Sequence, residues 1–266
     1  MFHQHGRSAP ERELLYGRQT LRECLRARRR ALHILWVADG VRPLGAAAEA
    51  MEAAREAGVP VRTCPKRDLD RWTRSANHQG LALEAGPYPY VDAEELVDAA
   101  AAAPGGDPAL VLVLDHMQDP QNVGALLRSA DAAGVQGVLI PEDRAAGITA
   151  AVVRASSGAA EHLPVARVRG LAPAVDGMRR KGIRVYGLEH SPEARPLYEA
   201  PLAGPVALVI GSEGAGLSRS IRSRCDGLLC LPMRGRVASL NASVAGALAM
   251  FEVRRQRGSA PADAGR

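Results

Sequence analysis

The stretch LPMRGRVASLNASVAGALAMFE, residues 231–252, decides how the second half of this chain folds. Its first residue closes a predicted strand (228–231), residues 232–239 form a loop rich in Pro and Gly, and the remainder is a nearly all-apolar helix. Val244, Leu248 and Phe251 recur at helical spacing, and alanines fill the rest of the helix surface. A helix with so little polar surface is expected to be buried.

Three short polar side chains stand where this helix begins: Ser239, Asn241 and Ser243. A helix start presents unpaired N–H groups that can hold a ligand, but Ser and Asn also cap helices without any further role. Taken by itself the segment favours capping. Any larger role for these residues depends on the loops that accompany them.

Composition excludes several classes of protein. The longest apolar runs are too short to span a membrane and the first residues lack the apolar core of a signal peptide, so a cytoplasmic protein is expected. The four cysteines form no C-x-x-C pair and no histidine pair flanks them at zinc-ligand spacing, which predicts reduced structural thiols and no metal site. The net charge of +5, carried mainly by arginine, is compatible with an anionic partner.

A change of composition between residues 87 and 108 divides the chain. We expect a small α/β domain over 12–86, a linker over 87–108 that contains a short helix and the breaker PGGDP, a larger α/β domain over 109–257 and a disordered tail over 258–266. The small domain is predicted to alternate helices (14–28, 45–57, 67–73) with strands (31–38, 59–64, 80–85).

The first of these helices and the residues after it are strongly basic. The arginines are Arg22, Arg26, Arg28, Arg29 and Arg30. They form either a solvated helix face, with the last ones favoured by the helix dipole, or a surface that contacts RNA.

Strands and helices alternate throughout the larger domain. The run ALVLVLD (109–115) is apolar without interruption, as strands buried on both faces are. The segments GVLIP, LPVARV, IRVYGLE and PVALVIG are further strand candidates, and a helix is predicted over 123–133. This alternation predicts a parallel sheet with helices on both faces.

Two further loops follow apolar strands of this domain, where open α/β sheets bind ligands. In DHMQDPQNVGALLRSADAAG, Asn122 stands at a helix start and Arg128 lies roughly 160° from the apolar stripe of that helix, pointing away from the core. In LVIGSEGAGLS, a strand enters a glycine-rich turn that holds Glu213. Its G-x-x-G-x-G spacing differs from the dinucleotide fingerprint, which disfavours a nucleotide-dependent oxidoreductase.

Taken in order, the three loops resemble the three motifs of the SpoU family of RNA ribose 2′-O-methyltransferases, within the SPOUT superfamily. The matching residues are N-x-G-A-L-L-R-S-A, L-V-I-G-S-E-G-x-G-L and L-P-M-x-G-x-V-x-S-L-N-x-S-V-A, and the resemblance extends over residues 108–257. The segments LLYGRQTLRECLR and NHQGLALEA resemble the substrate-binding domain of RlmB-type 23S rRNA guanosine 2′-O-methyltransferases, whose fold is similar to kink-turn-binding ribosomal proteins.

The resemblance implies a cofactor, a topology and an assembly. The family uses S-adenosylmethionine without a metal and forms homodimers. Its C-terminal segment folds into a deep trefoil knot, which the general rarity of knots in proteins would not lead one to predict. Transferred by position, backbone groups of Gly211, Leu231 and Leu240 would hold the cofactor. The functional side chains would be those of Asn122, Arg128, Glu213, Ser239 and Asn241.

The expected activity is methyl transfer to a ribose 2′-hydroxyl of RNA, with a guanosine of 23S rRNA as the target. Family proposals make the first-motif arginine, here Arg128, the general base, but a guanidinium keeps its proton up to about pH 12. We therefore expect Arg128 to remain charged, grip a phosphate and stabilise the developing alkoxide. The alternatives are a tRNA or resistance-type rRNA methyltransferase of the same family, and a non-catalytic RNA-binding or ribosome-assembly protein.

Overall fold

The computed structural model describes residues 12–102, 106–236 and 239–258. These residues form two compact units, one from Met1–Pro89 with Ile148–His162 and one from Tyr90–Gly147 with Leu163–Arg266. The predicted tail, apart from Gly258, and part of the PGGDP breaker lie outside the described residues. Among the described residues, helices are all too short or too polar to cross a membrane.

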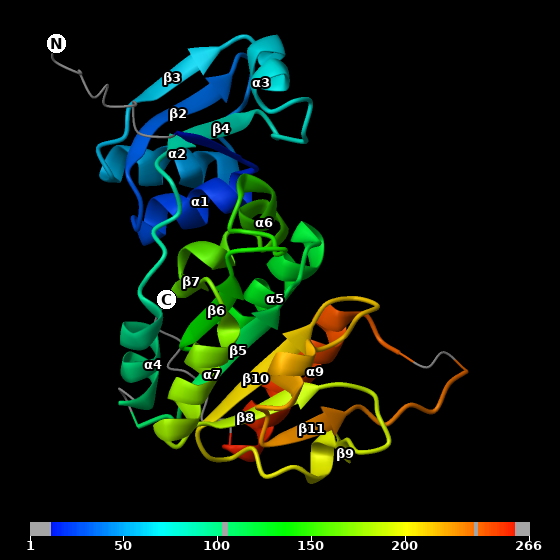
Figure 1. The fold of residues 1–266 in the computed structure, drawn as a ribbon. Helices are drawn as coiled ribbons and strands as arrows, with labels where there is room; N and C mark the ends of the chain where they lie inside the picture. Colours follow the sequence, from blue (N-terminus) through cyan, green and yellow to red (C-terminus); the bar gives the residue numbers. More distant parts are fainter. Residues whose placement is uncertain (1–11, 103–105, 237–238, 259–266) are drawn as a thin grey trace, which may run out of the picture. The chain divides into compact units, whose positions relative to one another are not determined.

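The first unit is a four-stranded sheet with helices, as the alternation of elements predicts. The strand order is β1-β4-β2-β3, in which β2 and β3 run parallel and the other pairs antiparallel. Helices α1 and α2 run along one face of this sheet (Figure 1). Its elements are β1 (Glu13–Tyr16), α1 (Arg18–Ala27), β2 (Leu32–Ala38), α2 (Ala46–Glu56), β3 (Val61–Cys64), α3 (Lys66–Trp72), β4 (Leu81–Ala85), α6 (Ala150–Ala155) and the short helix η1 (Ala159–Glu161).

The predicted helix over 14–28 is wrong in its first turn. Residues Glu13–Tyr16 form strand β1, which pairs antiparallel with β4, and the helix begins only at Arg18. Gly17 separates the two elements with a φ of 97°, a conformation that favours glycine. The apolar residues at 14 and 15 fit both periodicities, and pairing with β4 selects the strand.

The predicted boundaries assign residues 148–162 to the larger domain, but in the structure they form part of the first unit. Hydrogen bonds from Arg30 are the physical reason that residues 148–162 belong to the first unit. Its guanidinium donates to both carboxylate oxygens of Glu161, at 2.7 and 3.1 Å, and to Glu13 at 2.9 Å. Both Arg30 and Glu161 are buried, so an ion pair anchors this segment to the unit.

Three of the five arginines of the predicted basic surface form ion pairs within the first unit. Arg30 lies in the interior, and Arg22 forms ion pairs with Glu23 at 2.9 Å and with Glu49 at 2.7 Å. Arg26 lies 3.8 Å from Glu23 and 3.6 Å from Glu49. These carboxylates remove much of the positive field that an RNA-contacting helix would need.

The second unit contains the predicted parallel sheet. Its seven strands have the order β7-β6-β5-β10-β8-β11-β9, and all neighbouring pairs run parallel. The strands are β5 (Leu110–Asp115), β6 (Gly137–Pro141), β7 (Val165–Val168), β8 (Arg184–Leu188), β9 (Arg195–Pro196), β10 (Val206–Gly211) and β11 (Gly227–Cys230). The helices are α4 (Ala93–Ala101), α5 (Pro120–Ala132), α7 (Leu171–Arg180), η2 (Leu197–Glu199), α8 (Arg219–Arg222) and α9 (Ala242–Gln256).

Helices cover both faces of this sheet, as predicted (Figure 1). One face packs against α4 and α7, in a core that includes Val209 of the central strand β10. The neighbouring residue of that strand, Ile210, faces the other way and contacts α9. Helix α4 lies in the predicted linker, yet its Leu96 and Val97 are buried in the core of the second unit.

Helix α9 corrects the expectation that its apolar stripe is buried. Val244, Leu248 and Phe251 are 46%, 42% and 50% exposed in the single chain. At about 100° per residue they share one side of the helix. The opposite side, which includes Gly246 and Val253, packs on α5 and β10. The part of the helix up to Phe251 is therefore apolar on both faces, of which one is covered and one is open. The knot remains a prediction.

Candidate functional site

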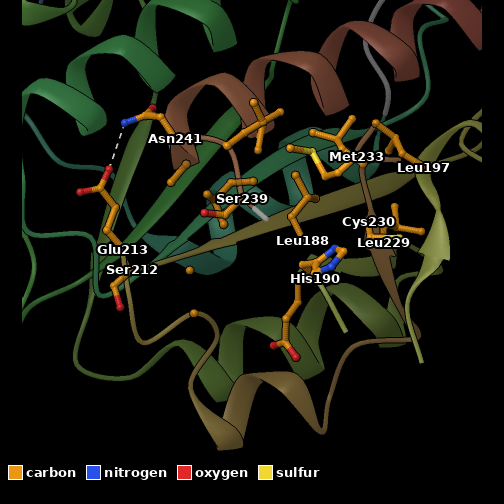
Figure 2. A pocket seen from close by; sticks show the side chains of 18 of the residues that line it. Leu188, His190, Leu197, Ser212, Glu213, Leu229, Cys230, Met233, Ser239 and Asn241 are labelled. Atoms are coloured by element: carbon orange, nitrogen blue, oxygen red, sulfur yellow. Dashed lines mark hydrogen bonds between the residues drawn. The ribbon is translucent and has the colours of Figure 1, made fainter. Parts of the chain in front are cut away.

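A pocket of about 640 Å³ opens at the carboxyl end of the large sheet, where the three loops singled out by the sequence converge. Strands β5 and β10 are neighbours in the sheet, and the loop after β11 returns to the same edge to start α9. Parallel strands place all their carboxyl ends on one edge, so the loops that follow them meet there. Figure 2 shows Glu213 and Asn241 at one end of this pocket and His190 farther along it.

Three polar side chains from separate elements form a hydrogen-bonded cluster beside this pocket. The Nδ2 of Asn122 donates to Oε1 of Glu213 at 2.6 Å. The Nδ2 of Asn241 donates to the same oxygen at 3.0 Å and to Oδ1 of Asn122 at 2.9 Å. Asn122 is buried, so the cluster holds the glycine-rich turn, the start of α5 and the start of α9 together.

Asn241 both caps α9 and belongs to the cluster. Its Oδ1 accepts from the backbone N–H groups of Ser243 at 2.9 Å and Val244 at 3.3 Å. Its Nδ2 is directed away from the helix, toward Glu213. On α5 the cap is Asp119, which accepts from the backbone N–H of Asn122. The Asn122 side chain is thereby left available for the cluster.

The glycine-rich turn folds back tightly on the strand that precedes it. Ser212 and Gly216 exchange two backbone hydrogen bonds, at 3.2 and 2.9 Å. A Cβ added to Gly211 would lie 2.3 Å from the carbonyl carbon of Gly216, so only glycine fits there. The buried Asp115 fixes the far end of the turn by accepting from the N–H of Ser218 at 2.6 Å.

Most of the predicted site residues line this pocket. They are Gly211, Glu213, Leu231, Ser239, Leu240 and Asn241. Asn122 joins them through its hydrogen bonds to Glu213 and Asn241. Arg128 is exposed on α5, as its position relative to the apolar stripe predicts, and it is not among the described residues that line the pocket. The individual roles of these residues remain predictions.

The part of the pocket that follows strand β8 was not predicted from the sequence. Glu189 and His190 line it there, and the Oε1 of Glu189 accepts from Nε of Arg222 at 3.0 Å. The carboxylates of Glu189 and Glu193 raise the pKa of the Arg222 guanidinium. The available signal was the acidic residue that ends the apolar run IRVYGLE, since strand ends on this edge carry ligand-binding groups.

All four cysteines are free thiols. Cys230 lines the pocket, whereas Cys225 is half-buried and its Sγ lies against Gly187 of β8. Burial raises the pKa of Cys225 to about 12, which keeps its thiol protonated at neutral pH. Within 12–102, 106–236 and 239–258, His, Cys, Asp and Glu side chains form no group that could hold a metal ion.

Comparison with known families explains this arrangement. The SpoU rRNA methylase family matches residues 109–251, which include all three loops that meet at or beside the pocket. The chain belongs to this family. Residues 14–91 match a second family, described as RNA 2′-O ribose methyltransferase substrate binding. The SpoU protein is thus an RNA methyltransferase with a substrate-binding domain before its catalytic domain, as the motifs predict.

Relatives and solved structures agree with this assignment. An uncharacterized tRNA/rRNA methyltransferase of Mycobacterium sp. (strain KMS) is 43% identical over 253 residues, which cover 95% of this chain and 79% of the relative. A crystal structure of an RNA 2′-O ribose methyltransferase is 25% identical, with a TM-score of 0.72 and coverage of 92% and 89%. The SpoU methyltransferase AviRb from Streptomyces viridochromogenes, in complex with AdoMet, has the same fold, with a TM-score of 0.75 at 24% identity over 92% and 90%.

Proposed function

We propose that this SpoU protein transfers the methyl group of S-adenosylmethionine to a ribose 2′-hydroxyl of RNA, and that its target is a guanosine of 23S rRNA. The observation that carries the proposal is the cluster of Asn122, Glu213 and Asn241 beside the 640 Å³ pocket. It unites the three segments whose residues resemble the family motifs.

The pocket fits the proposed cofactor in size and chemistry. Its apolar side chains suit an adenine ring, and they include Leu188, Leu197, Leu229, Leu231 and Met233. Two carboxylates, Glu189 and Glu213, suit a ligand that carries positive charge, and they would repel a pyrophosphate. Backbone groups at Gly211, Leu231 and Leu240 would hold the cofactor, which supplies a methyl group activated by a sulfonium.

The protein's own contribution to the reaction is to position the ribose and to stabilise negative charge. Asn122 and Ser239 would orient the attacking hydroxyl, and Glu213 is held in place by two amide donors. Arg128 would keep its charge, grip a phosphate of the RNA and stabilise the negative charge that develops on the 2′-oxygen as it attacks the methyl group. A lysine at position 128 would preserve the charge but not the two-pronged geometry.

The dimer of the family offers a way for Arg128 to reach the reaction. The exposed stripe of α9 (Val244, Leu248 and Phe251) gives a second copy an apolar surface to cover. Helix α5, which carries Arg128, packs directly against α9. We therefore propose a homodimer formed through this stripe, with Arg128 at the edge of the interface.

The function is tested by methyl transfer from radiolabelled S-adenosylmethionine to unmodified 23S rRNA, followed by mass spectrometry of the nucleosides. The expected product is 2′-O-methylguanosine. Arg128→Ala should lose most turnover while still binding the cofactor, and Arg128→Lys should recover little of it. Near-normal turnover by Arg128→Ala would remove this arginine from the mechanism.

The same assay separates the alternatives. Methylation of tRNA in place of 23S rRNA would make the protein a tRNA enzyme of the same family. A different methylated rRNA loop would favour a resistance-type enzyme. RNA binding without methyl transfer to either RNA would make it a non-catalytic RNA-binding or ribosome-assembly protein. Mapping 2′-O-methyl sites in RNA from a deletion strain then identifies the nucleotide.

A further inference from the structure

Both tryptophans of the chain lie together in the first unit, although aromatic residues make up only 3% of the sequence. Trp36 is in the middle of strand β2 and Trp72 ends helix α3. Their ring centroids are 5.2 Å apart, with an angle of 59° between the planes. Trp72 is 38% exposed and Trp36 is partly exposed, so the pair presents aromatic surface to solvent.

The pair lies on the face of the sheet opposite to the one on which the buried Leu35 and Val37 project. These two residues point into the core, and Trp36, between them, points the other way. Helix α3 covers part of the Trp36 face through Leu69, which packs with Ala38 and Ala82. The Nε1 of Trp36 donates to Glu84 at 2.8 Å, which fixes the orientation of the indole.

Three arginines lie on or next to the elements that carry this aromatic pair. Arg62 is exposed and aligns with Trp36 across the parallel strands β2 and β3, so both side chains project from the same face. Arg12 donates to Oε2 of Glu84 at 2.8 Å. The other oxygen of this carboxylate accepts the hydrogen bond from Trp36. Arg71 precedes Trp72 in α3; its side chain is 73% exposed and lies 3.5 Å from a carboxylate oxygen of Asp68. The acidic neighbour Glu84 is thus neutralised by Arg12, while Arg62 adds positive charge.

We propose that this surface, which we call the Trp–Arg face (Arg12, Trp36, Arg62, Arg71 and Trp72), binds a single-stranded segment of the substrate RNA. Unpaired bases stack on aromatic side chains irrespective of sequence, and arginines pair with the flanking phosphates. The identification of the occupant as RNA rests on the proposed function. Arg12 and Arg71 of this face also form exposed ion pairs, with Glu84 and Asp68, so Arg62 supplies the added positive charge.

Intrinsic fluorescence tests the proposal directly, because the two tryptophans of the Trp–Arg face are the only ones in the chain. The probe is a single-stranded oligouridine of about ten nucleotides, within the range that such surfaces bind. It should quench the emission of the full-length protein. Inorganic polyphosphate, which has charge but no bases, should quench far less. Equal quenching by polyphosphate would overturn base stacking.

Point variants give the second arm of the test. Trp72→Ala should weaken oligouridine binding by about 10-fold, and Trp72→Phe should retain most of the affinity. Arg62→Ala should weaken binding. It should also lower the slope of log affinity against log salt concentration by the amount expected for about one lost phosphate contact. Arg55→Ala is the matched control, because Arg55 is exposed on α2 in an ion pair with Glu52 and should leave binding unchanged. Unaltered affinity in both Trp72→Ala and Arg62→Ala would overturn the proposal.

Methyl transfer measured in parallel distinguishes this proposal from the proposed function. Cofactor affinity and melting temperature identify any variant that is misfolded. Normal rRNA affinity and methylation in a folded Trp72→Ala protein would eliminate the Trp–Arg face and leave the enzyme assignment intact. A wild-type protein that binds oligouridine with quenching but methylates no RNA would contradict the enzyme assignment and leave the Trp–Arg face standing.

Discussion

Replacing Gly211 by alanine tests whether the pocket depends on the tight return of the glycine-rich turn. The added Cβ would lie 2.3 Å from the carbonyl carbon of Gly216, 2.4 Å from its oxygen and 2.6 Å from the nitrogen of Leu217. All three are backbone atoms, so no side-chain rotation relieves the overlap. Ordinary contact begins at 3.4 Å, so the turn must move by about 1 Å.

This movement should impair catalysis more than stability. The turn carries Glu213, and a displacement of about 1 Å in catalytic geometry costs about 100-fold in rate. Overpacking of this kind costs about 1–3 kcal/mol, which lowers the melting temperature of a chain of this size by several degrees. We therefore expect Gly211→Ala to fold, to bind S-adenosylmethionine more weakly and to lose most methyl transfer.

The measurements are titration calorimetry with S-adenosylmethionine, methyl transfer to 23S rRNA and thermal melting. Gly204→Ala is the matched control, because a Cβ on Gly204 would meet nothing within 4 Å. Gly204 lies just before β10, and Gly211 is the last residue of the same strand. The control variant should match the wild-type protein in all three measurements. Wild-type cofactor affinity and turnover in Gly211→Ala would show that the tight return of this turn does not shape the site.

Four further predictions concern the site, the first unit and the assembly. Asn241→Ser keeps an oxygen that can cap α9 but loses the amide group that donates to Glu213. The free energy of unfolding should therefore change by less than about 1 kcal/mol, while turnover should fall at least about 10-fold. Normal turnover would mean that Asn241 serves only as a helix cap. Glu161→Ala leaves the buried Arg30 without its main partner and should cost about 3–5 kcal/mol in urea unfolding, far more than an exposed ion pair would. S-Adenosylmethionine should slow the modification of Cys230 by a thiol reagent, and an unchanged rate would argue against this pocket as the cofactor site. Phe251→Asp should make the protein monomeric in light scattering if the proposed dimer forms through α9, and a dimer that persists in this variant would point to a different interface.

The Arg30–Glu161 pair also changes how the first unit should be tested. Deleting residues 1–87 would remove Arg30 from the buried Glu161 and leave that carboxylate in the interior without its main cation. Loss of RNA binding in such a truncation would then mix lost contacts with local unfolding. Substitutions on the exposed Trp–Arg face separate the two effects, because they leave this ion pair intact.

Several features could be read from local patterns because local physics determines them. The run 109–115 is apolar at every position, as required of a strand covered on both faces, and it forms β5. The start of α5 was predicted one turn too late, although Asp119 followed by Pro120 is a cap and first-turn pair that marks it. The position of Arg128 away from the core followed from helical periodicity alone.

Other features depended on which surfaces meet. Up to Phe251, helix α9 is apolar on opposite sides, so its sequence could not tell which side packs on the sheet. Gly246 decides this, because a Cβ there would lie 2.4 Å from Leu126 of α5. The stripe of Val244, Leu248 and Phe251 is left open in the single chain, although its periodicity resembles that of a buried face.

The sequence alone therefore determined most strands of the large sheet, the glycine turn and the order of the three loops, since each depends on residues that are close in the chain. It also determined the family, because the marker residues keep a fixed order and spacing. Only the tertiary structure decided that Asn122, Glu213 and Asn241 meet, over separations of up to 119 residues. The order of strands in the sheet brings those segments to one edge, and strand order is set by long-range pairing that no local pattern encodes.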